Sequence, residues 1–267
     1  MSSLTFTIIQ TSLYWEQKAL NLQMLEQKIN SIKQKTEVVI LPEMFSTGFS
    51  MKPEQLAEEM DGETVAWMKR VSSEKKIILT GSIMIAEKGN YYNRLIWMLP
   101  NGEMGLYDKK HLFAYANEDK HYTSGKKRLI SSVKGWKINL QVCYDLRFPV
   151  WSRQSAISPE NNELEYDVLI YAANWPEKRS HMWKTLLQAR AIENQCFCIG
   201  VNRVGKDGND IYHSGDSMVV NPLGEIIYHK AHDEDIYTVS LQREDLNKTR
   251  EKMPFWKDAD QFKILQD

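Results

Sequence analysis

Residues 4–41 read LTFTIIQTSLYWEQKALNLQMLEQKINSIKQKTEVVIL. The stretch opens with a β-rich run at 4–10 and closes with the apolar run 38–41. Between them, at 15–35, apolar residues recur every three or four positions among Lys and Gln, which predicts a helix with one face on a core. The apolar positions are Leu20, Leu22, Met24, Leu25, Ile29 and Ile32. This order of strand, helix and strand predicts an α/β fold.

The alternation continues outward from this stretch, with a helix pattern at 63–76 and a strand pattern at 77–85. Two strand patterns, 92–99 and 103–107, are then joined through Asn101-Gly102, a strong hairpin signal. A hairpin among βα units predicts mixed sheets, and the number of strand patterns favours two packed sheets over one. Later strand patterns lie at 136–142, 167–171, 197–201, 217–220, 225–228 and 235–239, with a long helix pattern at 180–195.

Composition narrows the class of protein. Hydrophobic residues make up 42% of the 267 and charged residues 26%, which excludes a disordered, collagenous or coiled-coil chain. The 34 Lys and Arg nearly balance the 35 Asp and Glu, so no strong field attracts nucleic acid or anionic lipid. Three cysteines do not resemble a disulfide framework, and no export signal or membrane span is evident. We therefore expect a cytoplasmic protein without nucleic-acid or membrane partners.

No linker rich in Pro, Gly or Ser divides the chain, and the polar segment 116–127 is predicted to be a loop. A single domain over residues 1–267 is expected. The strand pattern 136–142 stops at Cys143, which places that thiol at the carboxyl edge of a sheet, where α/β proteins build their sites. Cys143 is thus a candidate nucleophile, and the alternative is a buried thiol that packs like a small hydrophobe. Cys196 and Cys198 share one strand face and are predicted to be core residues, because no second ligand pair supports a zinc site.

A nucleophilic thiol needs a base and a positive group near it. Glu43 follows the apolar run 38–41 and Pro42, so it falls at a strand end. Lys109, Lys110 and His111 follow the second hairpin strand in the same way. The alternative for the lysine pair is a solvated loop.

Three segments of the chain resemble the signature segments of the nitrilase superfamily of carbon–nitrogen hydrolases. They are 41–45 (LPEMF), 107–113 (YDKKHLF) and 142–149 (VCYDLRFP), in the family's order. Segments 174–176, 189–195, 215–217 and 221–225 match its later blocks, so the resemblance covers nearly the whole chain. It implies a four-layer α-β-β-α sandwich with two mixed β-sheets, in one carbon–nitrogen hydrolase domain whose residues 241–267 form a C-terminal tail.

The resemblance also implies a catalytic triad of Glu43, Lys109 and Cys143. Glu118 stands seven residues before Gly125, in the relation of the family's second glutamate, which orients the lysine or the substrate. The implied chemistry is amide hydrolysis through a cysteine thioester. No metal or organic cofactor is required for it.

The sequence around the nucleophile resembles one branch of the family. Cys-Tyr-Asp-Leu-Arg-Phe-Pro is similar to the Nit group, and 143–153 with 116–118 and 173–176 resemble bacterial ω-amidases of the YafV type. These enzymes cleave the terminal amide of small α-keto acid amides such as 2-oxoglutaramate and 2-oxosuccinamate. The alternatives are another Nit-group amidase, for example one acting on deaminated glutathione, a non-catalytic binding or assembly homologue, and a serine hydrolase built on 215–217.

Several residues are candidates for binding such a substrate. The resemblance implies that the backbone N–H of Tyr144 stabilises the oxyanion. The substrate carboxylate would favour a bidentate arginine, and Arg147, Arg179 and Arg203 are candidates. Trp175 follows a strand end and could wall the pocket. The alternatives are an Arg147 paired with a carboxylate in the nucleophile turn, and a Trp175 that only packs in the core.

Two further features concern assembly. Arg190 and Glu193, on an apolar helix pattern, are predicted to form a structural or interface ion pair rather than to touch substrate. The resemblance implies a homodimer that pairs through helices near the active site. The apolar residues within 253–265 favour docking of the chain end, either on a partner or on the same subunit.

Overall fold

The computed structural model describes residues 2–154, 156–158 and 163–265. Its first sheet has six strands in the order β15-β1-β2-β3-β4-β5. Strands β1, β2 and β3 run parallel, whereas β15 pairs antiparallel with β1 and β4 and β5 form the expected hairpin pairings. The bounds are β1 (Ser3–Gln10), β2 (Val38–Ile40), β3 (Ile78–Glu87), β4 (Asn90–Met98), β5 (Met104–Asp108) and β15 (Asp235–Gln242).

The second sheet has seven strands, in the order β12-β13-β11-β10-β7-β6 with β14 paired to β13. Its centre, β7, β10 and β11, is parallel, and the pairings of β6, β13 and β14 are antiparallel. Both sheets are therefore mixed. The bounds are β6 (Leu129–Val133), β7 (Trp136–Val142), β10 (Val168–Ala173), β11 (Phe197–Asn202), β12 (Val204–Lys206), β13 (Tyr212–Val220) and β14 (Ile226–Ala231), and β8 (Ala156–Ser158) pairs separately with β9 (Glu163–Leu164).

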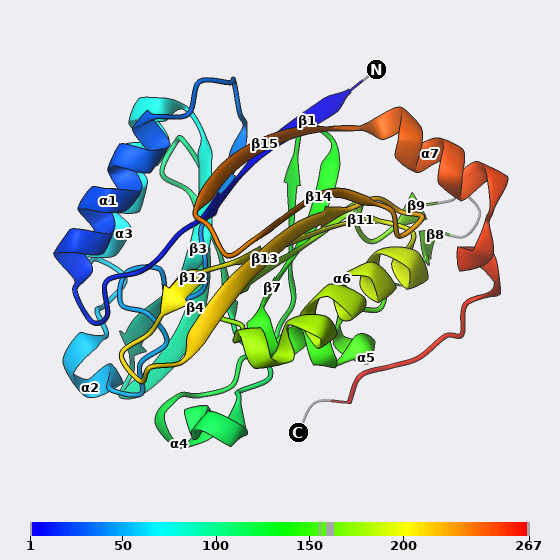
Figure 1. The fold of residues 1–267 in the computed structure, drawn as a ribbon. Helices are drawn as coiled ribbons and strands as arrows, with labels where there is room; N and C mark the ends of the chain where they lie inside the picture. The colour runs from blue at the N-terminus through cyan, green and yellow to red at the C-terminus, as the bar shows by residue number, and fades with distance from the viewer. Residues whose placement is uncertain (1, 155, 159–162, 266–267) are drawn as a thin grey trace.

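The helices form the outer layers (Figure 1). Helices α1 and α3 cover the outer face of the first sheet, and α6 covers that of the second. The helices are α1 (Lys18–Asn30), α2 (Pro53–Leu56), α3 (Glu63–Lys75), α4 (Glu118–His121), α5 (Pro149–Ser152), α6 (Ser180–Asn194) and α7 (Arg243–Lys252), with 3-10 turns η1 (Ala114–Ala116), η2 (Cys143–Arg147), η4 (Glu177–Arg179) and η5 (Phe255–Asp258). None of the helices in the described residues is long and apolar enough to cross a membrane.

The run 38–41 explains the layering. Successive side chains of a strand point to opposite faces. Val38 and Ile40 therefore pack in the core between the two sheets, and Val39 and Leu41 pack beneath α1 and α3. A strand buried on both faces needs apolar residues at every position, which is why this run does not alternate. The four-layer α-β-β-α sandwich with two mixed sheets is confirmed.

Some element boundaries differ from the sequence expectation. Helix α1 is shorter than the pattern 15–35, and Leu20 is exposed because the buried face carries Leu22, Leu25 and Ile29. The segment 116–127, expected as a loop, contains the short helix α4, which begins after Asn117 in a left-handed conformation. Such one-turn helices are too short to show a periodic pattern.

The range 241–267 holds more structure than a tail. Its first two residues complete β15, and helix α7 follows directly. Arg250 of α7 forms an ion pair with Asp167 at 2.9 Å and donates to the carbonyl oxygens of Tyr166 and Gln195. Phe255 and Phe262, farther along, are exposed, and residues 266–267 lie outside the described part of the chain.

Candidate active site

Cys143 lies where β7 ends. The chain turns there into η2, and Cys143 itself takes a left-handed backbone with φ of 45°. A non-glycine residue in this region stores strain, which is common at functional sites and persists only when the surroundings hold it. The side chain is 8% exposed and lines a cavity at the carboxyl edge of the sheet.

Two strand ends of the first sheet bring polar side chains to the same place as Cys143 of the second sheet. Glu43 comes three residues after β2, and Lys109 directly follows β5. The carboxyl ends of β2 and β5 lie at one edge because β5 pairs antiparallel to β4, which pairs antiparallel to β3. The backbone N–H of Glu43 donates to the carbonyl of Ala173 at 3.4 Å and so joins the two sheets beside the site.

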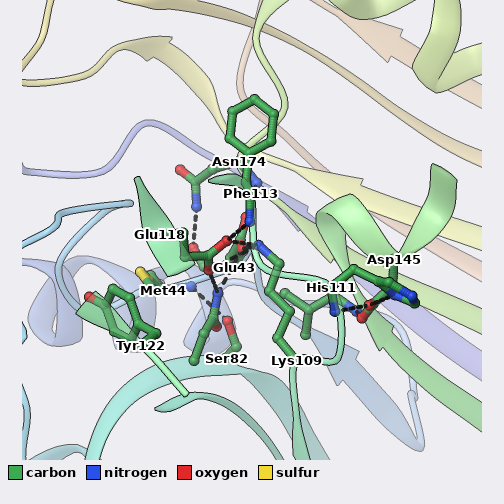
Figure 2. Close-up of polar contacts among 12 residues, drawn as sticks. Glu43, Met44, Ser82, Lys109, His111, Phe113, Glu118, Tyr122, Asp145 and Asn174 are labelled. Atoms are coloured by element: carbon green, nitrogen blue, oxygen red, sulfur yellow. Dashed lines mark hydrogen bonds and ion pairs between the residues drawn. The ribbon is translucent and has the colours of Figure 1, made fainter. Parts of the chain in front are cut away.

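Lys109 is buried between two carboxylates (Figure 2). Its Nζ lies 2.9 Å from Oε1 of Glu43 and 2.8 Å from Oε2 of Glu118, and all three side chains are inaccessible to solvent. Burial alone would lower the pKa of Lys109, but Glu118 and Glu43 outweigh it and raise that pKa, so the lysine stays charged. Lys110 points elsewhere, with Nζ 5.7 Å from the centre of the Trp151 ring.

The burial also affects the pKa of Glu118. Burial raises the pKa of Glu118, and the charge of Glu43 adds to the rise, against the opposing effect of Lys109. The backbone N–H of Phe113 also donates to Glu118, at 2.6 Å. The buried cluster therefore contains one cation, Lys109, and two carboxylates, Glu43 and Glu118.

Two asparagines complete the hydrogen bonding of Glu43, and sequence reasoning gave them no role. Asn93 of β4 donates to Oε1 of Glu43 at 2.8 Å and to Glu118 at 3.1 Å. Asn174, directly after β10, donates its backbone N–H to Oε2 of Glu43 at 2.8 Å. Asn174 lies in the segment 174–176 that carried the family resemblance, whereas the only signal for Asn93 is a polar residue within a strand.

The thiol of Cys143 is held in its neutral form. Burial raises its pKa well above the ordinary value, and the neighbouring carboxylate of Glu43 adds to the rise, while Lys109 opposes it. The carboxylate of Glu43 lies near enough to the thiol for its charge to raise this pKa. A group able to take the thiol proton is therefore adjacent to it.

Asp145 holds the turn of Cys143 against the segment of Lys109, a role that the sequence did not reveal. Its fully buried carboxylate accepts hydrogen bonds from the backbone N–H and Nδ1 of His111, at 2.9 and 2.8 Å, as Figure 2 shows. It also accepts from the hydroxyl of Tyr107 at 2.6 Å and from the backbone N–H of Val142 at 3.0 Å. These contacts fix the two strand ends relative to each other.

The cavity beside Cys143 is lined by Lys109 and by four of the five residues that the sequence suggested for substrate binding, Tyr144, Arg147, Trp175 and Arg179. Trp175 is also core, because its ring packs against the core Trp183 at 5.4 Å. Its Nε1 donates to the carbonyl of Arg179, another lining residue, at 2.8 Å.

The three arginine candidates have different surroundings. Arg147 has no carboxylate partner within the described residues, so the alternative of a structural ion pair in the nucleophile turn does not hold there. Arg203 is not part of the cavity wall: it is fully buried, and its Nη2 donates to the carbonyl of Lys206 at 2.9 Å. Burial lowers the pKa of Arg203 to about 10.

The remaining sequence candidates lie away from the cavity. Arg190 pairs with Glu193 at 3.1 Å, which confirms the predicted ion pair, and its Nη2 donates to the carbonyl of Leu146. Cys196 and Cys198 are buried in the core as predicted. Ser217, the residue of the serine-hydrolase alternative, is fully buried, and its hydroxyl accepts the backbone N–H of Asn202 at 2.9 Å. Across the described part of the chain, no cluster of three or more His, Cys, Asp or Glu could hold a metal ion.

Comparison with known proteins identifies the family. The carbon-nitrogen hydrolase family model matches residues 5–251. The chain belongs to the carbon–nitrogen hydrolase family. Membership makes this carbon–nitrogen hydrolase an amide-hydrolysing enzyme, and the matched range includes every residue of the site described above.

Individual relatives match over nearly their whole length. The chain is 40% identical over 265 residues to the omega-amidase YafV of Escherichia coli K12, covering 99% of this chain and 100% of the relative. It is 28% identical to the 2-oxoglutaramate amidase of Bacillus subtilis, over 95% of this chain and 96% of that protein. A solved structure of a CN-hydrolase superfamily protein from Xanthomonas campestris, with an arsenic adduct in its active site, superposes with a TM-score of 0.96 at 39% identity, covering 99% and 100% of the two chains.

Proposed function

We propose that this carbon–nitrogen hydrolase is an ω-amidase that converts small α-keto acid amides to the acid and ammonia. The observation that carries the proposal is the cavity wall that Cys143 shares with Lys109, whose charged Nζ is held by both Glu43 and Glu118. This combination supplies a nucleophile, a base and an electrophilic stabiliser where strand ends of the two sheets meet. The substrate class is that of the omega-amidase and 2-oxoglutaramate amidase relatives.

The first half-reaction forms a thioester. Glu43 takes the proton of the Cys143 thiol as the sulfur attacks the amide carbonyl, because the raised pKa of the thiol keeps little thiolate at rest. Lys109 and the backbone N–H of Tyr144 stabilise the oxyanion of the tetrahedral intermediate. Glu43 then gives its proton to the leaving nitrogen, the carbon–nitrogen bond breaks, and ammonia departs.

The second half-reaction restores the enzyme. Glu43 takes a proton from water, which attacks the thioester carbonyl, and the carbon–sulfur bond breaks to release the acid. The sulfur regains the proton from Glu43. Throughout both steps Glu118 holds Lys109 in place by charge-assisted hydrogen bonds, while Trp175 and Arg147 contact the substrate.

Release of ammonia from 2-oxoglutaramate and 2-oxosuccinamate tests this function. We expect rapid release by the native protein and none by Cys143→Ala. If both compounds are hydrolysed slowly or not at all, but another Nit-group substrate such as deaminated glutathione is hydrolysed, the proposed substrate class is wrong. A folded native protein inactive on a wide panel of amides would instead favour the non-catalytic homologue.

We propose further that the whole chain, residues 1–267, acts as one domain, and that the protein works as a cytoplasmic homodimer. Apolar side chains exposed on α5, α6 and β14 support the dimer. They are Val150, Met182, Ile192 and Ile226. The balance of charges on the chain supports a small-molecule substrate over nucleic acid or membrane lipid.

A further inference from the structure

Two arginines enter the wall of the cavity from different elements. Arg147 ends η2, four residues after Cys143, and Arg179 ends η4. Both line the same cavity as Cys143 and Lys109, and both are half-buried. A cavity that already contains the nucleophile therefore carries two additional positive charges.

Neither guanidinium pairs with a carboxylate among the residues that the structure describes. Arg147 lies over the ring of Trp175, with Cζ 4.9 Å from its centre, and its Nη2 is 3.1 Å from Sδ of Met182. Arg179 lies over the ring of Phe113, with Cζ 5.2 Å from its centre. Guanidinium groups that face aromatic rings and sulfur instead of a carboxylate keep N–H donors available for an anion.

The carboxylates near the cavity are engaged by groups other than the two arginines. Lys109 is already balanced by Glu43 and Glu118. The other carboxylate on the cavity wall, Asp207, accepts the backbone N–H groups of Asn209 and Ile211 through Oδ1 and so serves its own loop.

The two guanidiniums also repel each other. Burial lowers the pKa of Arg179 below its ordinary value, and the charge of Arg147 lowers it further. An anion bound between the two side chains would relieve both costs, since a carboxylate accepts the paired N–H groups of a guanidinium in a bidentate manner.

We propose that Arg147 and Arg179 together bind the carboxylate of the substrate while its amide lies at Cys143. The pair selects amides that carry a carboxylate at the opposite end over neutral amides of the same length. This inference rests on the proposed function for the amide end of the substrate, but the anion site itself depends only on the two arginines.

A kinetic comparison tests the selection. The substrates are 2-oxoglutaramate and 4-oxopentanamide, in which a methyl group replaces the carboxylate. We expect Arg147→Met and Arg179→Met each to lower the ratio of kcat/KM for the two by about 10- to 100-fold, mainly through KM for the charged substrate. The lysine variants of both residues should lose less, because they keep the charge but not the bidentate geometry. Lys178→Met, which removes an exposed charge next to Arg179, should leave the ratio unchanged.

A binding measurement separates this inference from the proposed function. Calorimetry with glutarate needs no turnover, and we expect both Met variants, but not Lys178→Met, to bind this dianion at least 10-fold more weakly than the native protein. Glutarate binding that depends on the arginines, without hydrolysis of either amide, would support the anion site and reject the substrate class. Hydrolysis of 2-oxoglutaramate with an unchanged selectivity ratio in folded Met variants would overturn the arginine pair and leave the amidase intact.

Discussion

At the scale of single residues, the site combines a buried group that stays charged with a buried group that stays neutral. Lys109 remains charged because Glu118 and Glu43 outweigh the cost of its burial, whereas the thiol of Cys143 is kept neutral. A positive group that is present before the reaction needs no reorganisation when an oxyanion forms. A neutral thiol must lose its proton as it attacks, which requires the adjacent Glu43.

The raised pKa of Cys143 gives a pH prediction. A thiol whose pKa is raised holds its proton to higher pH than a free cysteine, so we expect no thiolate at Cys143 between pH 6 and about 9. Ultraviolet thiolate absorbance, with Cys143→Ser subtracted to remove the signals of Cys196 and Cys198, measures this. A thiolate that titrates below pH 8 would show that the thiol is ionised before the substrate binds.

Glu118 offers a second prediction at this scale. Glu118→Gln removes a charge that holds Lys109 and leaves an amide N–H₂ facing a donor, so we expect kcat to fall by about 10- to 100-fold. The measurement is steady-state ammonia release, with the exposed neighbour variant Asp119→Asn as the control. Equal losses in the two variants would mean that Glu118 has no specific role.

The residues of the site differ in how visible they were in the sequence. Glu43, Lys109 and Cys143 each follow a recognisable strand pattern, and α/β proteins place their sites at strand ends. The pattern did not show that Cys143 comes from a different sheet than the other two. Asn93 lies within a strand, and its importance comes from pairing across to Glu43 and Glu118. A contact between residues so far apart in sequence leaves no local pattern.

At the scale of elements, the turn η2 is strained and is held by its neighbours. Asp145 ties it to Tyr107 and His111 beside Lys109, and Arg190 of α6 donates to the carbonyl of Leu146. A left-handed Cys143 persists only because these contacts fix the turn. The elements around the site therefore position the nucleophile as firmly as the residues that touch it.

Replacement of Asp145 tests this positioning. Asp145→Asn places an amide N–H₂ against at least one buried donor, which we expect to lower the free energy of unfolding by about 1–3 kcal/mol and kcat by about 10- to 100-fold, with KM little changed. Tyr107→Phe removes one of the four donors and should have a smaller effect on kcat. A loss confined to stability, with kcat unchanged in the folded variant, would contradict the positioning role.

Elements were predicted best where they are long. The helix pattern 180–195 matches α6 within one residue, and the strand pattern 136–142 matches β7. Helix α7, which followed the last predicted strand, is polar over most of its surface and buries Leu246, so its periodicity is weak. It is held by contacts such as that of Arg250 with Asp167, which depend on the tertiary fold.

At the scale of the whole molecule, the order of strands and helices was enough to predict two mixed sheets, and the family resemblance supplied their stacking. The physical basis of that stacking is that the apolar side chains of 38–41 point in turn into the core between the sheets and into the core beneath the helices. The fold alone does not explain why apolar side chains are exposed on the outer surface. Exposed apolar residues gather on α6 and its neighbours, and Ile192 of α6 lies against the turn at Gly224.

The proposed homodimer is tested on this surface. We expect light scattering to give about twice the chain mass of 31.2 kDa at micromolar concentration, and Ile192→Glu to give the monomer, because a buried unpaired charge disfavours the interface. Leu20→Glu, on the exposed side of α1 in the opposite outer layer, is the matched control and should remain dimeric. A native protein at the monomer mass would refute the dimer.

The central claim is that the acyl group of the amide is transferred to the thiol of Cys143. The most direct measurement is the intact mass of enzyme quenched with acid during turnover of 2-oxoglutaramate, followed by mapping of the modified peptide. We predict a gain equal to the substrate minus ammonia, located on Cys143 and absent from Cys143→Ala. Ammonia release by Cys143→Ala, or an adduct located on Ser217, would contradict the account.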